Sequence, residues 1–253
     1  MPATVTLIGI EGLPDIRPGE DLAAMLVDAA KAQGTPLAAH DILVVTQKVV
    51  SKAEGRVVDL RSIEPSPVAE RFAAPWAKDP RVVEVALREA KRIVRMDNGV
   101  LITETRHGFI CANSGVDASN VGLPGGDFVV LLPEDPDASA RRLRDAVRAC
   151  VGVDVAVLIS DTFGRPWREG AANVAVGLAG MEPLWDYRGE RDNDGRELRT
   201  TVIAIADEVA AASELVTNKL TKVPAAVVRG YPYRPGESGI APMVRRREMD
   251  LFR

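Results

Sequence analysis

The clearest chemical signal in the sequence is a carboxylate and a hydroxyl at the end of an apolar, β-prone run. The run starts at Ala156 and reaches Asp161 and Thr162, which supply hard oxygen donors. A buried strand that ends in this way puts ligand groups where α/β sheets tend to place them. Mg²⁺ and Mn²⁺ take such donors together with phosphate oxygens. The alternative is that Asp161 caps the following turn and Thr162 satisfies a backbone group.

A turn at residues 163–166 is expected directly after this strand, and it carries more chemistry than a connector needs. Arg165 and Arg168 flank Trp167 in and after the turn. Arginines bind carboxylates bidentately, so the pair is expected near an anionic substrate. Trp167 and His107 could contact a substrate ring, but packing is the favoured interpretation for both.

A second candidate region, residues 112–121, combines small residues with Asp117, Ser119 and Asn120. Small residues let the backbone approach a ligand closely, while the carboxylate and amide groups supply polar contacts. An Asx-rich turn without a ligand would have the same composition, so both interpretations stay open.

Two lysines, Lys48 and Lys52, follow the predicted strand 42–46. We expect residues 47–55 to form a polar strand end and a turn. Lysines at such a junction are either solvated or neutralise phosphate oxygens as mobile point charges.

The elements that must position these residues follow from apolar periodicity and turn signals. Strands are predicted at residues 4–10, 42–46, 99–104, 107–111, 156–161, 200–206 and 225–229. Helices are predicted at residues 21–33, 81–94, 137–150 and 207–216, with Asp137 and Ser139 as candidate caps of the third helix. The whole chain, residues 1–253, is interpreted as a single domain, and residues 231–253 as a tail on the surface or at a subunit interface.

Composition excludes several classes of protein. The chain has 253 residues, of which 46% are hydrophobic and 27% charged, and these values are typical of a soluble globular protein. The net charge of −4 makes nucleic acid an unexpected partner. No apolar run reaches the length of a membrane span, so we expect a cytoplasmic protein. Cys111 and Cys150 allow at most one disulfide and are interpreted as buried thiols.

Six stretches, in the same order along the chain, resemble the coenzyme F420:L-glutamate ligases, also called F420-0:gamma-glutamyl ligases. The resemblance covers about residues 8–230. The matching stretches are EGLPDIRPGEDL, DILVVTQKVVSKAEGR, ICANSGVDASNV, LLPEDPDASARRLR, ISDTFGRPWREGAANVAVGLAG and DYRGERDNDGRELRTTVIAIADEVAAASELV.

The resemblance implies a GTP-dependent ligase that joins L-glutamate to the terminal carboxylate of the F420 precursor, F420-0. It implies an α+β fold of two interleaved subdomains with mixed sheets, peculiar to the family, assembled as an intertwined homodimer. It also implies Mg²⁺ or Mn²⁺, two ions per site, with K⁺ as a further cation.

The resemblance also assigns roles to individual residues. Asp117, Asp161 and Thr162 match the family's metal ligands, and Asp117, Asp161 and Lys52 are the candidate catalytic residues. The candidate GTP contacts are Gly12, Leu13, Pro14, Asp15, Gln47, Lys48, Lys52, Asn120, Thr217, Asn218, Lys219, Leu220, Thr221, Lys222 and Val223. The segment 217–223 departs from some relatives, in which an acidic residue lies in a glycine-rich stretch, so Lys219 is expected to put a positive charge there instead.

The residue types are consistent with ligation through an acyl phosphate, with release of GDP and phosphate. Such a reaction depends on cations around phosphoryl oxygens more than on a nucleophilic side chain. Two other functions fit the same aspartates. One is a metal-dependent nucleotide phosphohydrolase, and the other is a nucleotide-binding regulatory protein.

Overall fold

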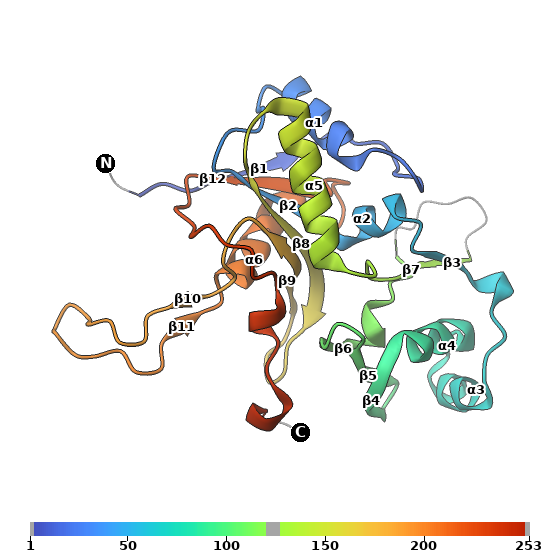
Figure 1. The fold of residues 1–253 in the computed structure, drawn as a ribbon. Helices are drawn as coiled ribbons and strands as arrows, with labels where there is room; N and C mark the ends of the chain where they lie inside the picture. Colours follow the sequence, from blue (N-terminus) through green and yellow to red (C-terminus); the bar gives the residue numbers. More distant parts are fainter. Residues whose placement is uncertain (1–2, 120–126, 251–253) are drawn as a thin grey trace.

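The computed structural model describes residues 3–119 and 127–250, which form an α+β protein around a mixed sheet (Figure 1). The strand order in this sheet is β1-β12-β2-β8-β9. Its strands are β1 (Thr6–Ile10), β2 (Ile42–Thr46), β8 (Ala156–Gly164), β9 (Ala171–Ala179) and β12 (Ala225–Arg229). β2 and β8 pair in parallel, whereas the other neighbours are antiparallel.

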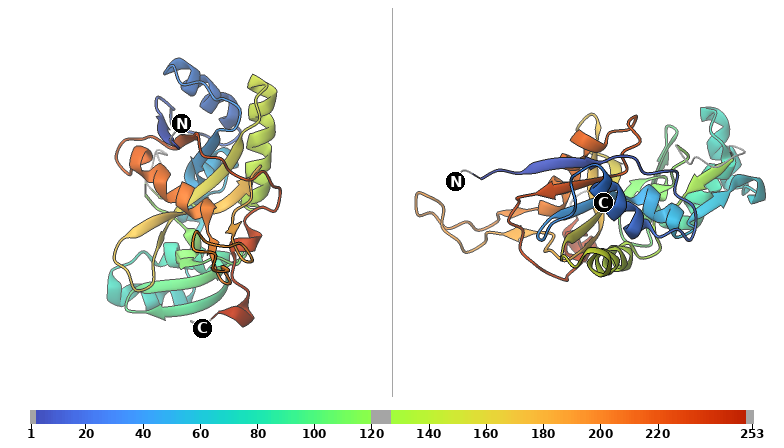
Figure 2. Two further views of the ribbon diagram at one scale, coloured as in Figure 1. Left: turned by 90° about the vertical axis from the view of Figure 1, so that its left-hand side faces the viewer. Right: turned by 90° about the horizontal axis from the view of Figure 1, so that it is seen from above.

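Helices cover both faces of this sheet. α1 (Leu22–Ala32) and α5 (Pro136–Val151) pack on one face, and α6 (Ile205–Thr217) packs on the other (Figure 2). Successive side chains of a strand point to opposite faces. In β2, Leu43 and Val45 therefore join the core beneath α1 and α5, while Ile42 and Val44 join the core beneath α6. Burial on both faces explains why these strands are apolar throughout.

Between β2 and β8 the chain forms two smaller sheets, and two of the helices in this segment pack with them around an apolar core of their own. This part, residues 57–130, is called the smaller module. β3 pairs with β7, and β4, β5 and β6 form a separate sheet. The elements are α2 (Gln47–Ala53), β3 (Val57–Asp59), α3 (Pro67–Ala73), α4 (Pro80–Glu89), β4 (Ala90–Asp97), β5 (Val100–Thr105), β6 (Ile110–Ala112) and β7 (Phe128–Val130). Short 3₁₀ turns are η1 (Leu60–Ser62), η2 (Ala74–Trp76), η3 (Asn113–Gly115), η4 (Ala241–Met243) and η5 (Arg247–Met249). The division into two interleaved subdomains stays a prediction.

Two predicted elements are wrong in type. Residues 47–53 form the helix α2 instead of a strand end and turn, because Val49, Val50 and Ala53 recur at helical spacing and pack inward. The predicted helix 81–94 ends at Glu89, and Ala90 starts the strand β4, which pairs with β5.

Other elements differ from the prediction in their bounds. β8 continues to Gly164, so the turn expected at 163–166 falls at residues 165–170, and residues 171–179 return as β9. The predicted strand 200–206 shortens to β11 (Val202–Ile203), because α6 begins at Ile205. Asp135, and neither Asp137 nor Ser139, caps α5, since its carboxylate accepts a hydrogen bond from the backbone N–H of Ala138 at 2.9 Å.

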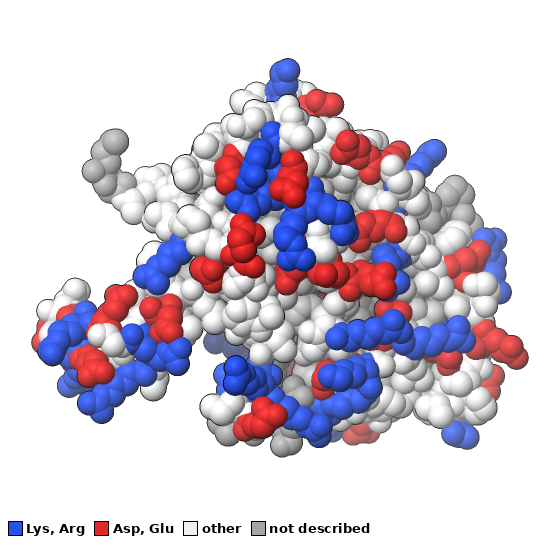
Figure 3. Space-filling view, viewed as in Figure 1, with Lys and Arg blue, Asp and Glu red and all other residues white. Residues whose placement is uncertain are grey.

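An extended arm projects from the body of the protein (Figure 1). It begins at β10 (Trp185–Asp186), runs through a charged loop and returns through β11, which pairs with β10. Figure 3 shows acidic and basic side chains interspersed on this arm and over the central part of the same face. None of the helices in residues 3–119 and 127–250 is long and apolar enough to cross a bilayer.

Candidate active site

Four segments that are distant in sequence meet at one edge of the central sheet. β2 and β8 are parallel, with Thr46 opposite Ser160, so the residues that follow each strand emerge at the same edge. β12 runs antiparallel to both β2 and β1, so the segment that leads into β12 and the one that leaves β1 lie there too. The topology therefore brings together residues 11–16, 47–52, 161–162 and 217–224.

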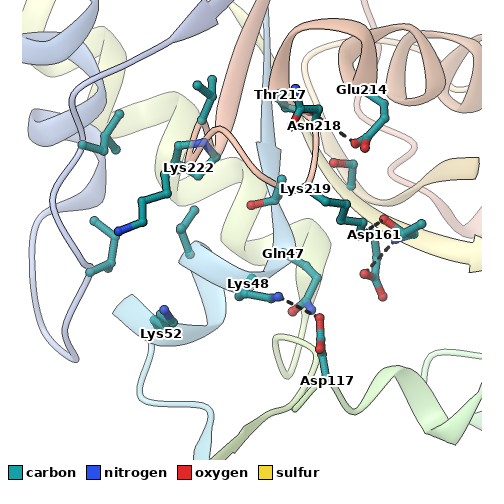
Figure 4. Close-up of a pocket in the computed structure, with 18 of the residues that line it drawn as sticks. Gln47, Lys48, Lys52, Asp117, Asp161, Glu214, Thr217, Asn218, Lys219 and Lys222 are labelled. Carbon is teal, nitrogen blue, oxygen red and sulfur yellow. Dashed lines mark hydrogen bonds and ion pairs between the residues drawn. The ribbon is translucent and has the colours of Figure 1, made fainter. Parts of the chain in front are cut away.

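These segments surround a cavity of about 540 Å³ (Figure 4). Most of the predicted site residues line it. They are Leu13, Pro14, Asp15, Gln47, Lys48, Lys52, Asp117, Asp161, Thr162, Thr217, Asn218, Lys219, Leu220, Lys222 and Val223. Gly12 and Thr221 are adjacent to lining residues but do not line the cavity themselves, and Asn120 lies outside the described residues.

Asp117 reaches the cavity from the smaller module. A backbone bridge to Val130 holds it beside β7, where Asp117 N–H donates to the Val130 carbonyl at 3.0 Å. Lys48 Nζ contacts Asp117 Oδ2 at 2.8 Å and donates to the Ser119 carbonyl at 2.8 Å. Burial raises the pKa of Asp117, but hydrogen bonds from Lys48 and Ser119 outweigh this effect and the pKa is lowered. Asp117 is therefore held as an anion against Lys48.

Asp161 is placed by an irregularity in the β8–β9 pair. The register shifts between Ile159 and Ser160, so β9 contains one residue more than β8 at this point. Bulges of this kind redirect side chains at the end of a ladder. Burial raises the pKa of Asp161 to about 7; the backbone N–H of Thr162 opposes this, and the nearby charge of Asp117 adds to it. A carboxylate in this position gains from a bound cation, because the cation offsets both effects.

Thr162 belongs to a hydrogen-bonded chain that crosses the cavity wall. Its hydroxyl donates to Asn173 Oδ1 at 2.7 Å, and Asn173 Nδ2 donates to Glu214 Oε2 at 3.0 Å. Lys219 Nζ donates to the Thr162 hydroxyl at 2.8 Å. These hydrogen bonds thus connect the ammonium group of Lys219 to the carboxylate of Glu214.

Two of the four lysines that line the cavity, Lys48 and Lys52, are largely enclosed, whereas Lys219 and Lys222 are exposed. Lys52 is 6% exposed, and burial lowers its pKa while Asp15 raises it. The side chain of Lys48 is 20% exposed. The interpretation of these two lysines as solvated is therefore wrong. Together with Lys219 and Lys222 they surround the cavity with positive charge (Figure 4).

The donor set fits a divalent ion that is shared with phosphate. No three His, Cys, Asp or Glu side chains cluster closely enough, among the residues that are described, to hold a metal alone. Mg²⁺ needs only one or two protein carboxylates when phosphate and water oxygens complete its shell. Asp161 and Asp117 meet that requirement. Ser160 adds a buried hydroxyl at the cavity whose oxygen has no hydrogen-bond partner within the described part of the chain, as is expected where a ligand completes the site.

Sequence reasoning missed Glu214 and Asn173 in the cavity wall. Glu214 lies one turn before the end of α6, immediately upstream of the predicted nucleotide segment, and that proximity was the available signal. Asn173 could be found only through the β8–β9 register, which sets it opposite Thr162.

Three residues in the turn after β8, namely Arg165, Trp167 and Arg168, do not line the cavity. Arg165 lies in the β8–β9 turn, where its guanidinium donates to the carbonyls of Glu169 and Gly170 at 2.7 and 3.2 Å. Arg168 is exposed in the same turn and does not line the cavity. Trp167 is 78% exposed, so its assignment as a packing residue is wrong.

For His107 and the two cysteines, the structure confirms two of the predictions and contradicts one. His107 is a packing residue as predicted, because its ring stacks on Phe109 with centroids 5.7 Å apart and its Nε2 donates to the Pro133 carbonyl at 3.0 Å. Cys111 is buried as predicted, whereas Cys150 is exposed. Cys150 lies in the last turn of α5, beyond Val147, the last buried residue of that helix.

The fold and the cavity define the class of this protein as an α+β protein with a cavity lined by lysines and carboxylates at the edge of its central sheet. The sequence model of the F420-0:Gamma-glutamyl ligase family matches residues 11–230. The chain therefore belongs to the F420-0:gamma-glutamyl ligase family, which is a family of enzymes.

Three relatives named coenzyme F420:L-glutamate ligase are similar over most of their length. The protein from Methanothermobacter thermautotrophicus is 45% identical over 252 residues, which cover 98% of this chain and 99% of the relative. The one from Methanopyrus kandleri is 50% identical over 216 residues, 85% of this chain and 82% of the relative. The one from Methanocaldococcus jannaschii is 41% identical over 250 residues, 98% and 97% of the two chains.

Proposed function

We propose that this protein is a GTP-dependent ligase that joins L-glutamate to the terminal carboxylate of F420-0. Membership of the family and the names of the relatives support the acceptor and the amino acid. The observation that carries the use of a nucleoside triphosphate is the cavity, where lysines and two aspartates from distant segments face one space. That arrangement suits a polyanion and its counter-cations.

The reaction needs an activated acyl group, because a carboxylate does not exchange oxide for an amine at neutral pH. An oxygen of the F420-0 carboxylate attacks the γ-phosphorus of GTP, the bond from that phosphorus to the β-phosphate oxygen breaks, and GDP leaves. The product of this step is an acyl phosphate. The α-amine of glutamate then attacks the acyl carbon, phosphate leaves with the electron pair of the C–O bond, and the amine loses a proton.

The side chains of the cavity bind and orient the reactants in this scheme. Lys52, Lys219 and Lys222 neutralise phosphate oxygens, and Lys48 fixes Asp117 while it adds to the positive field. Asp117 and Asp161 would hold a divalent ion, Mg²⁺ or Mn²⁺, which supplies charge stabilisation to the transferred phosphoryl group. The wall built by Thr162, Asn173 and Glu214 keeps these groups in one geometry.

One incubation separates this proposal from hydrolysis and from regulation by bound nucleotide. The protein is mixed with GTP, Mn²⁺, F420-0 and glutamate, and GDP and the glutamylated product are measured by chromatography and mass spectrometry. We expect continued release of GDP only when acceptor and glutamate are both present, in equal amounts with the product. GDP release without either substrate would indicate a phosphohydrolase, and binding of GTP without turnover would indicate a regulatory protein.

A further inference from the structure

We propose that the ammonium group of Lys219 takes the place of one of the two divalent cations implied by the resemblance, so that the nucleotide-loaded protein binds one divalent ion per protomer. The proposal rests on the proposed function in so far as it takes GTP to be the ligand of the cavity. It concerns the positive charges that neutralise the phosphate groups, and it assigns one of these charges to a side chain of the protein.

The first observation is the position of the Lys219 ammonium. Its Nζ lies 2.8 Å from the hydroxyl oxygen of Thr162, which the sequence matched to a metal ligand. Asp161, the residue before Thr162 and a second predicted ligand, lines the same cavity as Lys219. A positive charge thus already contacts one of the three predicted ligands and faces a second.

The second observation is the orientation of the Thr162 hydroxyl. Its proton is donated to Asn173 Oδ1, and Asn173 is itself fixed because its Nδ2 donates to Glu214. The oxygen of Thr162 therefore turns its lone pairs toward Lys219. A divalent ion on that oxygen would lie beside an ammonium group, and the two positive charges would repel strongly in a partly enclosed cavity.

The third observation is that the loop around Lys219 is shaped by its own hydrogen bonds. Asn218 Oδ1 accepts from the backbone N–H of Leu220 at 2.8 Å, and the Thr221 hydroxyl donates to the Thr217 carbonyl. The loop begins at the C-terminal end of α6, next to Glu214. Lys219 is therefore presented to Thr162 from a defined turn.

The remaining donors suffice for a single ion. Asp161 and Asp117 face the same cavity, and one or two carboxylates complete a nucleotide-bound Mg²⁺ or Mn²⁺. An ammonium group has three N–H donors, of which the bond to Thr162 uses one. The other two are available to phosphate oxygens. The site would thus combine one exchangeable cation with one that chelators cannot remove.

The test is the number of Mn²⁺ ions bound per protomer, measured by electron paramagnetic resonance of free Mn²⁺. The full chain is saturated with guanosine 5′-(β,γ-imido)triphosphate, and nucleotide binding is measured independently by calorimetry. We expect one Mn²⁺ in the wild type and two in Lys219→Glu, because that change removes the competing charge and adds a ligand. Lys78→Glu makes the same charge change at an exposed position that does not line the cavity, and it is expected to keep one Mn²⁺.

A second measurement tests how much the charge of Lys219 contributes to nucleotide binding when no metal is present. In EDTA, Lys219→Gln is expected to weaken binding of the same nucleotide about tenfold, because it removes a charge-assisted hydrogen bond to phosphate. Lys219 lies in an exposed loop, and circular dichroism checks that the variants keep the wild-type fold.

The outcomes separate the two proposals. With the nucleotide bound, two Mn²⁺ ions in the wild type, or a single ion in Lys219→Glu, would overturn the role of Lys219. Unchanged affinity of Lys219→Gln in EDTA would do the same. Absence of nucleotide binding by the wild type would instead contradict the use of GTP, and with it the proposed function.

Discussion

The carboxylate of Asp161 lies where β8 leaves the core and meets the cavity. Its pKa is raised to about 7 by burial, and the charge of Asp117 contributes to the rise. An anion is maintained in such a place only if cations gather around it, and Lys48, Lys219 and a bound divalent ion would do this. The raised pKa therefore supports the proposed place of Asp161 in the site.

Asp161→Asn tests this role at the residue scale. The change keeps the shape of the side chain and removes its charge, so we expect the rate of ligation to fall about 100-fold or more, since a metal ligand and its orienting charge are lost together. The rate of GDP release with all substrates present is the measurement. Asp97→Asn, at the half-exposed turn between β4 and β5, is the control and should retain the wild-type rate. Equal rates in both variants would remove Asp161 from the site.

The two cysteines differ enough for a simple chemical test. Burial raises the pKa of the Cys111 thiol to about 12, and Asp161 adds to the rise, whereas Cys150 is exposed at the end of α5. Because the thiolate is the reactive form, one thiol per chain should react rapidly with an aromatic disulfide reagent at pH 8. Both should react in guanidinium chloride. Rapid reaction of two thiols in the native protein would contradict the burial of Cys111.

At the scale of elements, the site depends on strand order. The sequence predicted the strand at 225–229 with its bounds, and it predicted β2 and the apolar run that leads to Asp161. Apolar runs with β-branched residues mark strands, but they do not state which strands are neighbours. The parallel pairing of β2 with β8 had no local signal, and neither had the antiparallel pairing of β12 with β1 and β2. Residue types alone pointed to the lysines and carboxylates of the site, whereas the family resemblance supplied residues 12–15, 47 and 217–223.

Errors in the prediction of individual elements also arise because the sequence pattern does not show which strands pair. The sequence predicts that the helix continues to residue 94, because apolar residues at 90 and 94 continue the helical spacing of α4, but these residues belong to β4. Pairing with β5 decides the outcome instead, and tertiary context of this kind commonly overrides a local pattern. Residues 171–179 were not predicted as a strand, and that omission hid Asn173 from the sequence-based site.

Gly177 tests the packing of α5 against β9. A Cβ at this buried position would lie 2.5 Å from the backbone oxygen of Pro136 at the start of α5, so the helix or the strand would have to move. We expect Gly177→Ala to lower the free energy of unfolding by about 1–3 kcal/mol, the usual effect of overpacking. Urea denaturation followed by fluorescence gives the value.

Gly164→Ala is the matched control for this change. Gly164 is exposed at the end of β8, and a Cβ there meets no atom within 4 Å. Its unfolding free energy should stay within about 0.5 kcal/mol of the wild type, as is usual for surface substitutions. Equal destabilisation in the two variants would show that the contact between Gly177 and Pro136 is not the cause.

At the scale of the whole molecule, the last segment of the chain completes the core under α6. Tyr231, Tyr233, Ile240 and Met243 pack against that core. Asp137 ties the segment to the body, since its carboxylate accepts hydrogen bonds from the backbone N–H groups of Leu178 and Ile240 at 2.8 and 3.1 Å. These contacts position the tail against the elements that frame the cavity.

The homodimer remains a prediction, and the arm formed by β10, β11 and the loop between them is the element that we expect to carry it. The arm projects from the body and has few neighbours in its own chain, so a second copy would bury it (Figure 1). Light scattering should give twice the chain mass of 27.1 kDa for the wild type. Replacing residues 188–200 by a short glycine turn should give a mass of one chain. A wild-type protein with the mass of one chain would refute the homodimer.

The most direct test of the account follows an oxygen atom from the acceptor. F420-0 labelled with ¹⁸O in its terminal carboxylate is incubated with GTP, Mn²⁺, glutamate and the protein, and the released phosphate is analysed by mass spectrometry. Phosphoryl transfer to the carboxylate predicts one ¹⁸O atom in the phosphate for each amide formed, because the acyl phosphate passes its bridging oxygen to the leaving group. Phosphate that carries no ¹⁸O while the amide accumulates would contradict activation of the acceptor in this cavity.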